Sequence, residues 1–137
     1  MSVISGDLDR FKQVNDSHGH AAGDLVLRES ASVLGAVVGS SGILGRLGGE
    51  EFLVLMPGAP AAAARVLAER LRAAMADHLF VLPVNQSEVR HSVSHRQTIS
   101  LGVAEWTSAM LDACDLLDAA DRRLYQSKHE GRNRVSG

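Results

Sequence analysis

The sequence lacks most of the features that would crosslink the chain or anchor it in a membrane. Cys114 is the only cysteine among 137 residues, so no disulfide can form within the chain. No apolar run approaches the roughly 20 residues of a membrane span, and no signal peptide is visible. The formal net charge of -2 excludes the basic excess typical of proteins that bind nucleic-acid polymers. We therefore expect a cytoplasmic protein, in which a local basic cluster can still hold a small phosphate ligand.

Length and apolar periodicity predict one α+β domain over residues 1–137, with 45% hydrophobic residues to form its core. The stretch 79–97 is interpreted as a loose hairpin. Apolar runs and repeats predict strands over 2–5, 43–47, 52–56 and 98–104, helices over 21–38, 60–77 and 110–128, one helical turn over 10–16 and a loop over 17–20. This order favours a ferredoxin-like arrangement, with a central, mostly antiparallel sheet flanked by helices.

The same periodicity predicts which side of each helix is buried. The expected inward positions are Leu27, Ala31, Leu34 and Val38 in the first long helix, Ala64, Leu67, Leu71 and Met75 in the second, and Ala113, Leu117, Ala120 and Leu124 in the last.

Two glycines directly before two acids, Gly48-Gly49-Glu50-Glu51, separate two apolar strands. Paired glycines reach the positive φ values of tight hairpin turns, so the pattern predicts a hairpin. Hairpin formation does not require two adjacent acids, which repel each other. By itself the motif fits a solvated turn as well as a site where a cation or a proton-transfer role compensates the repulsion.

Asp7 ends the first predicted strand, which lies beside the hairpin in a ferredoxin-like sheet. The carboxylates of Asp7, Glu50 and Glu51 can therefore converge. Carboxylate oxygens select hard cations such as Mg²⁺ or Mn²⁺, and two such ions form the clamp used in nucleotidyl transfer.

Four separated motifs then occur in one order. They are Asp7-x-Asp9-x-Phe11-Lys12-x-x-Asn15 with Gly23-Asp24, Arg46-x-Gly48-Gly49-Glu50-Glu51-Phe52, Ser100-x-Gly102-Val103-Ala104, and Leu124-Tyr125-x-x-Lys128-x-x-Gly131-Arg132-Asn133. Together they resemble the GGDEF-domain diguanylate cyclases, in the GGEEF variant, over nearly the whole chain. That family has a nucleotidyl-cyclase palm fold, and its members condense two GTP molecules into cyclic di-GMP and pyrophosphate across a homodimer.

The resemblance implies a role for individual residues. Glu51, Glu50 and Lys12 resemble the catalytic residues. Asp7, the Leu8 carbonyl, Glu50 and Glu51 resemble the ligands of Mg²⁺ or Mn²⁺, with two ions in each active site. Asn15 and Asp24 resemble the residues that bind guanine, and Phe11, Lys12, Lys128 and Arg132 resemble those that bind the phosphates. Asp9 is expected to support local structure.

The guanine assignment makes physical sense. Guanine presents N1–H and an exocyclic amino group on one edge, and the Asp24 carboxylate can accept both, whereas adenine has an acceptor at N1. A site built this way rejects the wrong base by up to roughly 10⁴-fold, because its own polar groups would be left unpaired. Taken without the motif, Asp24 is an ordinary first-turn helix acid, and Lys128 and Arg132 are ordinary helix-end cations.

The chain departs from the family pattern in two respects. The sequence starts at the first strand, so either it is a fragment or the family helix that precedes this strand is missing, and Gly39-Ser40-Ser41-Gly42 stands where many members have an inhibitory Arg-x-x-Asp that binds the product. Product could still occupy the active site. Two rival functions remain: a catalytically silent module that binds GTP or cyclic di-GMP, and an adenylyl-cyclase-like nucleotidyl cyclase, against which the guanine-binding residues argue.

Overall fold

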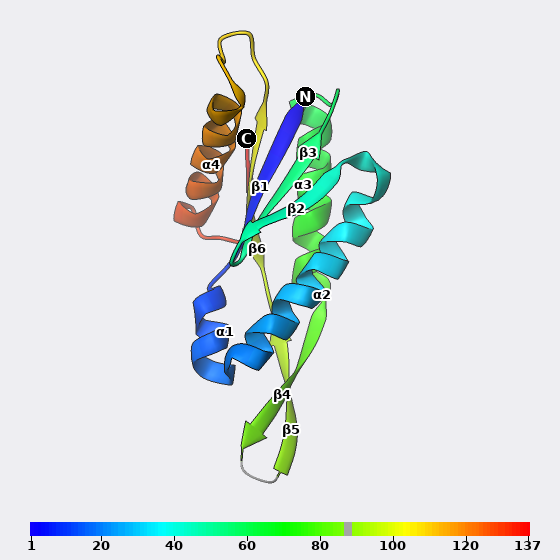
Figure 1. The fold of residues 1–137 in the computed structure, drawn as a ribbon, viewed down its shortest axis with the longest axis vertical. Helices are drawn as coiled ribbons and strands as arrows, with labels where there is room; N and C mark the ends of the chain where they lie inside the picture. Colours follow the sequence, from blue (N-terminus) through cyan, green and yellow to red (C-terminus); the bar gives the residue numbers. More distant parts are fainter. Residues whose placement is uncertain (87–88) are drawn as a thin grey trace.

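The fold, seen in a computed structural model that describes residues 1–86 and 89–137, is built on a five-stranded sheet (Figure 1). The strands lie in the order β2-β3-β1-β6-β7, and they comprise β1 (Ser2–Leu8), β2 (Ile43–Gly48), β3 (Glu51–Met56), β6 (Ile99–Glu105) and β7 (Val135–Ser136). β1 pairs antiparallel with both β3 and β6, and only β7 runs parallel to its neighbour. The predicted α+β class with a mostly antiparallel sheet is confirmed.

Helices cover both faces of the sheet. α2 (His20–Val38) and α3 (Ala61–Asp77) pack together, and α4 (Ala113–His129) packs on β6 and β1. Successive strand residues point to opposite faces. Ile4 accordingly belongs to the main core with α2 and α3, while its neighbour Val3 packs with Leu116 and Ala120 of α4. β1 is therefore buried along its whole length.

The predicted helices are present, with corrections at their ends and faces. Residues 17–20 are not a loop, because α1 (Phe11–His18) and α2 are separated by Gly19 alone, with φ 88°. The last helix starts at Ala113 instead of residue 110, because Asp112 caps it by accepting from the Cys114 amide at 2.9 Å.

The buried faces of the helices are only partly as predicted. All four predicted positions of α3 are buried. In α2, Leu34 and Val38 are buried, but Leu27 and Ala31 are only half-buried. In α4, Ala120 is buried as predicted, Leu117 and Leu124 are half-buried and Ala113 is exposed, while Leu116 and Ser127 are buried without having been predicted.

The predicted hairpin over 79–97 exists as β4 (Leu79–Gln86) and β5 (Val89–Arg96), which form a separate two-stranded sheet. It extends away from the main sheet, at the end where α1 lies (Figure 1). The predicted turn at 85–87 reaches beyond the described residues at position 87. No helix among the described residues is long and apolar enough to cross a membrane.

Gly102 allows the closest approach of α4 to the sheet. A Cβ atom at Gly102 would lie 2.2 Å from the Leu124 nitrogen and 2.3 Å from the Ala120 oxygen, and neither backbone atom can move aside cheaply. We expect Gly102→Ala to lower the free energy of unfolding by about 3 kcal/mol or more, measured by urea denaturation. Gly45→Ala is the matched control, because nothing lies within 4 Å of its added Cβ. A loss below about 1 kcal/mol at Gly102 would contradict this packing.

Candidate active site

The end of β1 and the tip of the β2–β3 hairpin form the centre of the candidate site. Asp7 pairs in register with Glu51 on β3, and the Leu8 amide donates to the Glu50 carbonyl at 3.2 Å. The turn uses Gly49 at φ 51°, a conformation that favours glycine. The structure thus brings the two predicted acids of the hairpin next to the end of β1.

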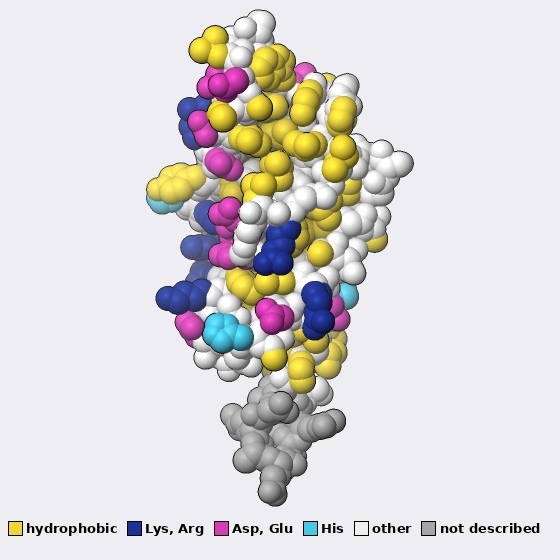
Figure 2. Space-filling model, viewed as in Figure 1, with side chains coloured by type: hydrophobic (Ala, Val, Ile, Leu, Met, Phe, Trp, Pro, Cys, Tyr) yellow, Lys and Arg dark blue, Asp and Glu magenta, His cyan; other side chains and the backbone are white. Residues whose placement is uncertain are grey.

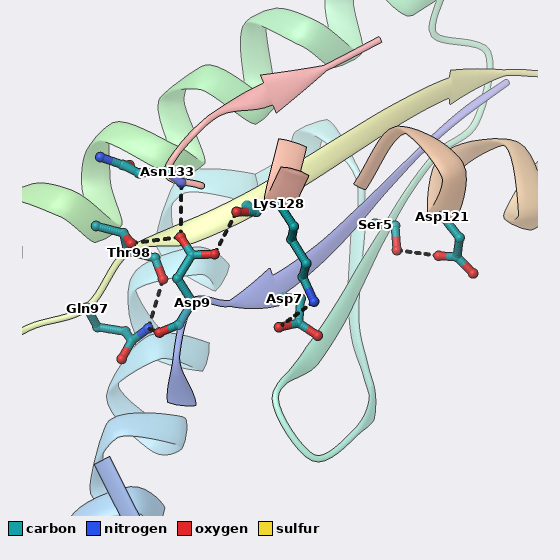
Figure 3. Close-up of polar contacts among 9 residues, drawn as sticks. Ser5, Asp7, Asp9, Gln97, Thr98, Asp121, Lys128 and Asn133 are labelled. Carbon is teal, nitrogen blue, oxygen red and sulfur yellow. Dashed lines mark hydrogen bonds and ion pairs between the residues drawn. The ribbon is translucent and has the colours of Figure 1, made fainter. Parts of the chain in front are cut away.

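Asp7 is a largely buried carboxyl group that forms an ion pair and has a shifted pKa. Its side chain is 10% exposed, and Oδ1 lies 3.1 Å from Nζ of Lys128 on α4 (Figure 3). Burial raises the pKa of Asp7; Lys128 opposes that shift, and the nearby charges of Glu50 and Glu51 add to it. Asp7 therefore lies close to the carboxyl groups of Glu50 and Glu51 as well as to the ammonium group of Lys128.

A divalent cation fits this donor set. Carboxylate and carbonyl oxygens are the ligands that Mg²⁺ and Mn²⁺ prefer, and the mutual repulsion around Asp7 is relieved by added positive charge. Among the described residues, no three Asp, Glu, His or Cys side chains already form a metal-ligating group. The carboxylates of Asp7, Glu50 and Glu51 are neighbours, and holding an ion between them would require their side chains to move closer together.

The raised pKa of Asp7 gives a pH dependence without divalent cations. A carboxyl whose folded pKa exceeds its unfolded value contributes stability that is complete below 3.8 and is lost as pH rises through the raised value. Asp7→Asn removes this loss. We therefore expect the free energy of unfolding of Asp7→Asn, minus that of wild type, to increase between pH 3 and pH 7. The increase should be about 1.4 kcal/mol for each tenfold increase in proton affinity that folding gives to Asp7. Urea denaturation across that range measures it, and a constant difference would contradict it.

The predicted guanine-binding residues lie on α1 and α2, which pack against each other. Asn15 on α1 lies against Gly23, whose added Cβ would be 1.9 Å from Asn15 Oδ1. The next residue, Asp24, is exposed and lines a depression of about 340 Å³ with Leu27, Arg28 and Arg46. Figure 2 shows acidic and basic side chains across the middle of this face of the molecule.

Two arginines beside Asp24, Arg28 and Arg46, have no role in the sequence-based prediction. Arg28 follows Asp24 by four residues and so lies on the same side of α2, and this spacing was a signal that could have been used. Arg46 donates from Nε to the Gly49 carbonyl at 2.8 Å and thereby braces the glycine turn.

Gly23 is expected to be required for the position of Asn15. Gly23→Ala places a methyl group where Asn15 Oδ1 lies, so the amide must rotate away. For GTP, the ligand that the resemblance in the sequence implies, we expect the affinity to fall about tenfold, with little loss of stability, as measured by calorimetry. Gly35→Ala in the same helix is the control, because its added Cβ makes only a 3.8 Å contact with Leu44. Equal GTP affinities in the two variants would contradict this role.

The predicted phosphate-binding residues come from two directions. Phe11 and Lys12 begin α1, with Phe11 buried and Lys12 exposed. Lys128 lies near the end of α4, and Arg132 follows the helix in the left-handed conformation, at φ 64°. The structure places Lys128 beside Asp7, and this is the one ion pair that joins a predicted phosphate-binding residue to the carboxylates within the described part of the chain.

A second cavity, of about 310 Å³, lies on the flank of α1 that faces the link between β5 and β6. It contains none of the predicted site residues. Its lining consists of Asp9, Arg10, Gln13, Val14, Ser17, His18, His95, Arg96, Gln97 and Thr98. The candidate site is therefore placed by the neighbouring carboxylates of Asp7, Glu50 and Glu51 and not by this cavity.

Comparison with known proteins agrees with this geometry. The family described as "Diguanylate cyclase, GGDEF domain" matches residues 1–134. The chain is a GGDEF domain. Diguanylate cyclase A of Treponema denticola is 36% identical over 136 residues, which are 99% of this chain and 34% of that protein. The chain spans 12% to 35% of the length of the first three curated relatives that it matches.

Solved GGDEF domains have the same fold. The GGDEF domain of DgcB from Caulobacter crescentus, in complex with c-di-GMP, superposes with a TM-score of 0.85 at 32% identity, over 98% of this chain and 75% of that chain. The active GGEEF domain of a diguanylate cyclase from Vibrio cholerae gives 0.83 at 32% identity, over 98% and 80%. The resemblance seen in the sequence is confirmed. Diguanylate cyclases of this family are generally metal-dependent.

Proposed function

We propose that this GGDEF domain is an active diguanylate cyclase, which condenses two GTP molecules into cyclic di-GMP with release of pyrophosphate. The observation that carries the proposal is the placement of Asp7 directly opposite Glu51 on neighbouring strands, with Glu50 bonded to Leu8 beside them. A domain that only binds nucleotide has no need for three neighbouring carboxyl groups at a place where burial, together with the charges of Glu50 and Glu51, raises the pKa of Asp7.

We assign the site residues to three roles: binding the base, binding the phosphates and holding the metal ions. Asn15 and Asp24 bind the guanine edge, and Phe11, Lys12, Lys128 and Arg132 bind the phosphates. Asp7, Glu50, Glu51 and the Leu8 carbonyl would hold two Mg²⁺ or Mn²⁺ ions, which supply charge neutralisation at the transferred phosphate. We assign Glu51 as the acid that accepts the proton of the attacking ribose 3′-hydroxyl.

One domain alone cannot complete the reaction. Each domain holds one GTP, whose 3′-hydroxyl attacks the α-phosphate of the GTP on a second copy, so we propose a homodimer of residues 1–137 in catalysis. Product formation from GTP and Mg²⁺, measured across protein concentrations, tests this. A rate per molecule that rises steeply with concentration supports it. A concentration-independent rate would contradict the dimer.

The rival is a silent module that binds GTP or cyclic di-GMP. The intact set of Asp7, Asn15, Asp24, Glu50 and Glu51 favours the cyclase, since a binding module does not need the acids of the hairpin. Binding of GTP without product at any concentration would favour the rival.

We also propose that this domain lacks feedback inhibition through the Arg-x-x-Asp site. Gly39 and Gly42 stand at the two positions, and the backbone itself disfavours side chains there. Gly39 has φ 48°, and a Cβ at Gly42 would lie 2.6 Å from the Leu55 carbonyl oxygen. Restoring the motif would therefore require Gly42 and β3 to move apart.

A further inference from the structure

The segment that carries Arg132 has an unusual backbone. Gly131, Arg132 and Asn133 all have positive φ values, of 123°, 64° and 47°. This conformation costs free energy in residues that carry a Cβ, so two successive examples persist only where surrounding contacts impose them. Such strain is often found at functional sites.

Asp9 supplies the contact that ties this segment to the strand of the candidate site. Its Oδ2 accepts from the backbone amide of Asn133 at 3.0 Å (Figure 3). Other contacts also hold the segment: the Arg132 amide donates to the Ser127 carbonyl at 3.0 Å, Arg72 donates to Asn133 Oδ1 at 3.1 Å, and Arg134 Nε donates to the Arg132 carbonyl at 3.2 Å. Asp9 follows Asp7 and Leu8 directly, so one residue joins two parts of the site.

The Asp9 carboxylate is itself held firmly. It is 7% exposed, and it accepts from Thr98 Oγ1 at 2.7 Å and from Ser100 Oγ at 2.6 Å. Its amide also donates to the Thr98 carbonyl at 2.9 Å. Hydrogen bonds to an ionised group are stronger than neutral ones, so this buried carboxylate is a rigid anchor.

We propose that Asp9 is a positioning residue for the triphosphate of GTP. Through the Asn133 amide it holds residues 131–133 in their strained conformation and thereby fixes the guanidinium of Arg132 relative to Asp7 and Leu8. The proposal rests on the proposed function, because Arg132 is assigned there to the phosphates. It explains why a buried carboxylate beside the predicted metal ligands faces away from them, toward backbone and hydroxyl donors.

A double-mutant cycle tests the proposal. The probe is a GTP analogue with a methylene between the α- and β-phosphates, and calorimetry on the full chain measures its affinity. Asp9→Ala and Arg132→Ala should each weaken binding about tenfold, whereas the double variant should be no more than about threefold weaker than Arg132→Ala. Guanosine, which has no phosphates, should bind all of them within about twofold. In turnover, Asp9→Ala should raise KM more than it lowers kcat.

The control is Thr98→Val with Ser100→Ala, which removes two bonds from the same carboxylate but keeps the Asn133 contact. It should weaken analogue binding by no more than about threefold, less than Asp9→Ala does, and should keep hydrogen-exchange protection of the Asn133 amide, which Asp9→Ala should lose. If Asp9→Ala does not fold, Asp9→Asn replaces it, with a smaller loss in the same direction.

Three results would overturn the proposal: additive losses of about a hundredfold in the double variant, equal weakening of guanosine, or an equal loss in the control. Failure of the wild-type domain to bind the analogue would instead overturn the proposed function. The two failures are thus distinguishable.

Discussion

Glu51→Gln is expected to slow formation of cyclic di-GMP at least about 10³-fold. The substitution keeps the size of the side chain and removes the negative charge that lies opposite Asp7 in the sheet. Both assigned roles, holding a cation and accepting the proton of the 3′-hydroxyl, require a carboxylate. The measurement is the initial rate of product formation at saturating GTP and Mg²⁺.

The fold should survive this substitution, because Glu51 is exposed. Its thermal midpoint should stay near that of wild type, and GTP should still bind through Asn15 and Asp24. Asp118→Asn, on an exposed position of α4 with no assigned role, is the matched loss of one surface carboxylate and should keep the wild-type rate. A Glu51→Gln rate within about tenfold of wild type would remove Glu51 from the chemistry.

Asp24→Asn should lower kcat/KM for GTP by about 10²-fold or more and reduce the preference for GTP over ATP. The reason is the pattern of donors on guanine. A carboxylate accepts from both N1–H and the exocyclic amino group, whereas an amide presents one acceptor and one donor, so a guanine donor loses its partner.

Comparison of GTP, ITP and ATP as substrates measures this effect. ITP lacks the exocyclic amino group, so the wild-type domain should discriminate against it, and Asp24→Asn should discriminate less. Asp16→Asn on α1 is the control, since Asp16 is exposed and has no assigned role. Unchanged base preference in Asp24→Asn would show that the base is recognised elsewhere.

The sequence was sufficient to predict β1, β2, β3 and β6 and the acidic hairpin, because these follow from local patterns, whereas β7 (Val135–Ser136) was not predicted. The two glycines before Glu50 specify the turn, and the apolar runs on either side specify β2 and β3. The face of α4 could not be predicted in the same way. Its buried side uses Ala120 against Gly102 and places Ser127 inward, where its hydroxyl donates to the Leu101 carbonyl at 2.7 Å.

Contacts between residues that are distant in the sequence also could not be predicted. Asp9 was expected to support local structure, but its bonds to Thr98, Ser100 and Asn133 span 89, 91 and 124 residues. The role of Gly23 also depends on a neighbour in space, because only the structure shows Asn15 lying over it. Periodicity cannot reveal such pairs.

The most direct test of the central claim is to join two copies of the domain. A fusion to a parallel dimeric coiled coil raises the effective concentration of one copy at the other into the millimolar range. At nanomolar protein with GTP and Mg²⁺, the account predicts that the fusion forms cyclic di-GMP at least about a hundred times faster per domain than the free chain, and that Glu51→Gln in the fusion abolishes it. A fused domain that binds GTP but forms no cyclic di-GMP, at low or high concentration, would contradict the account and identify a silent module.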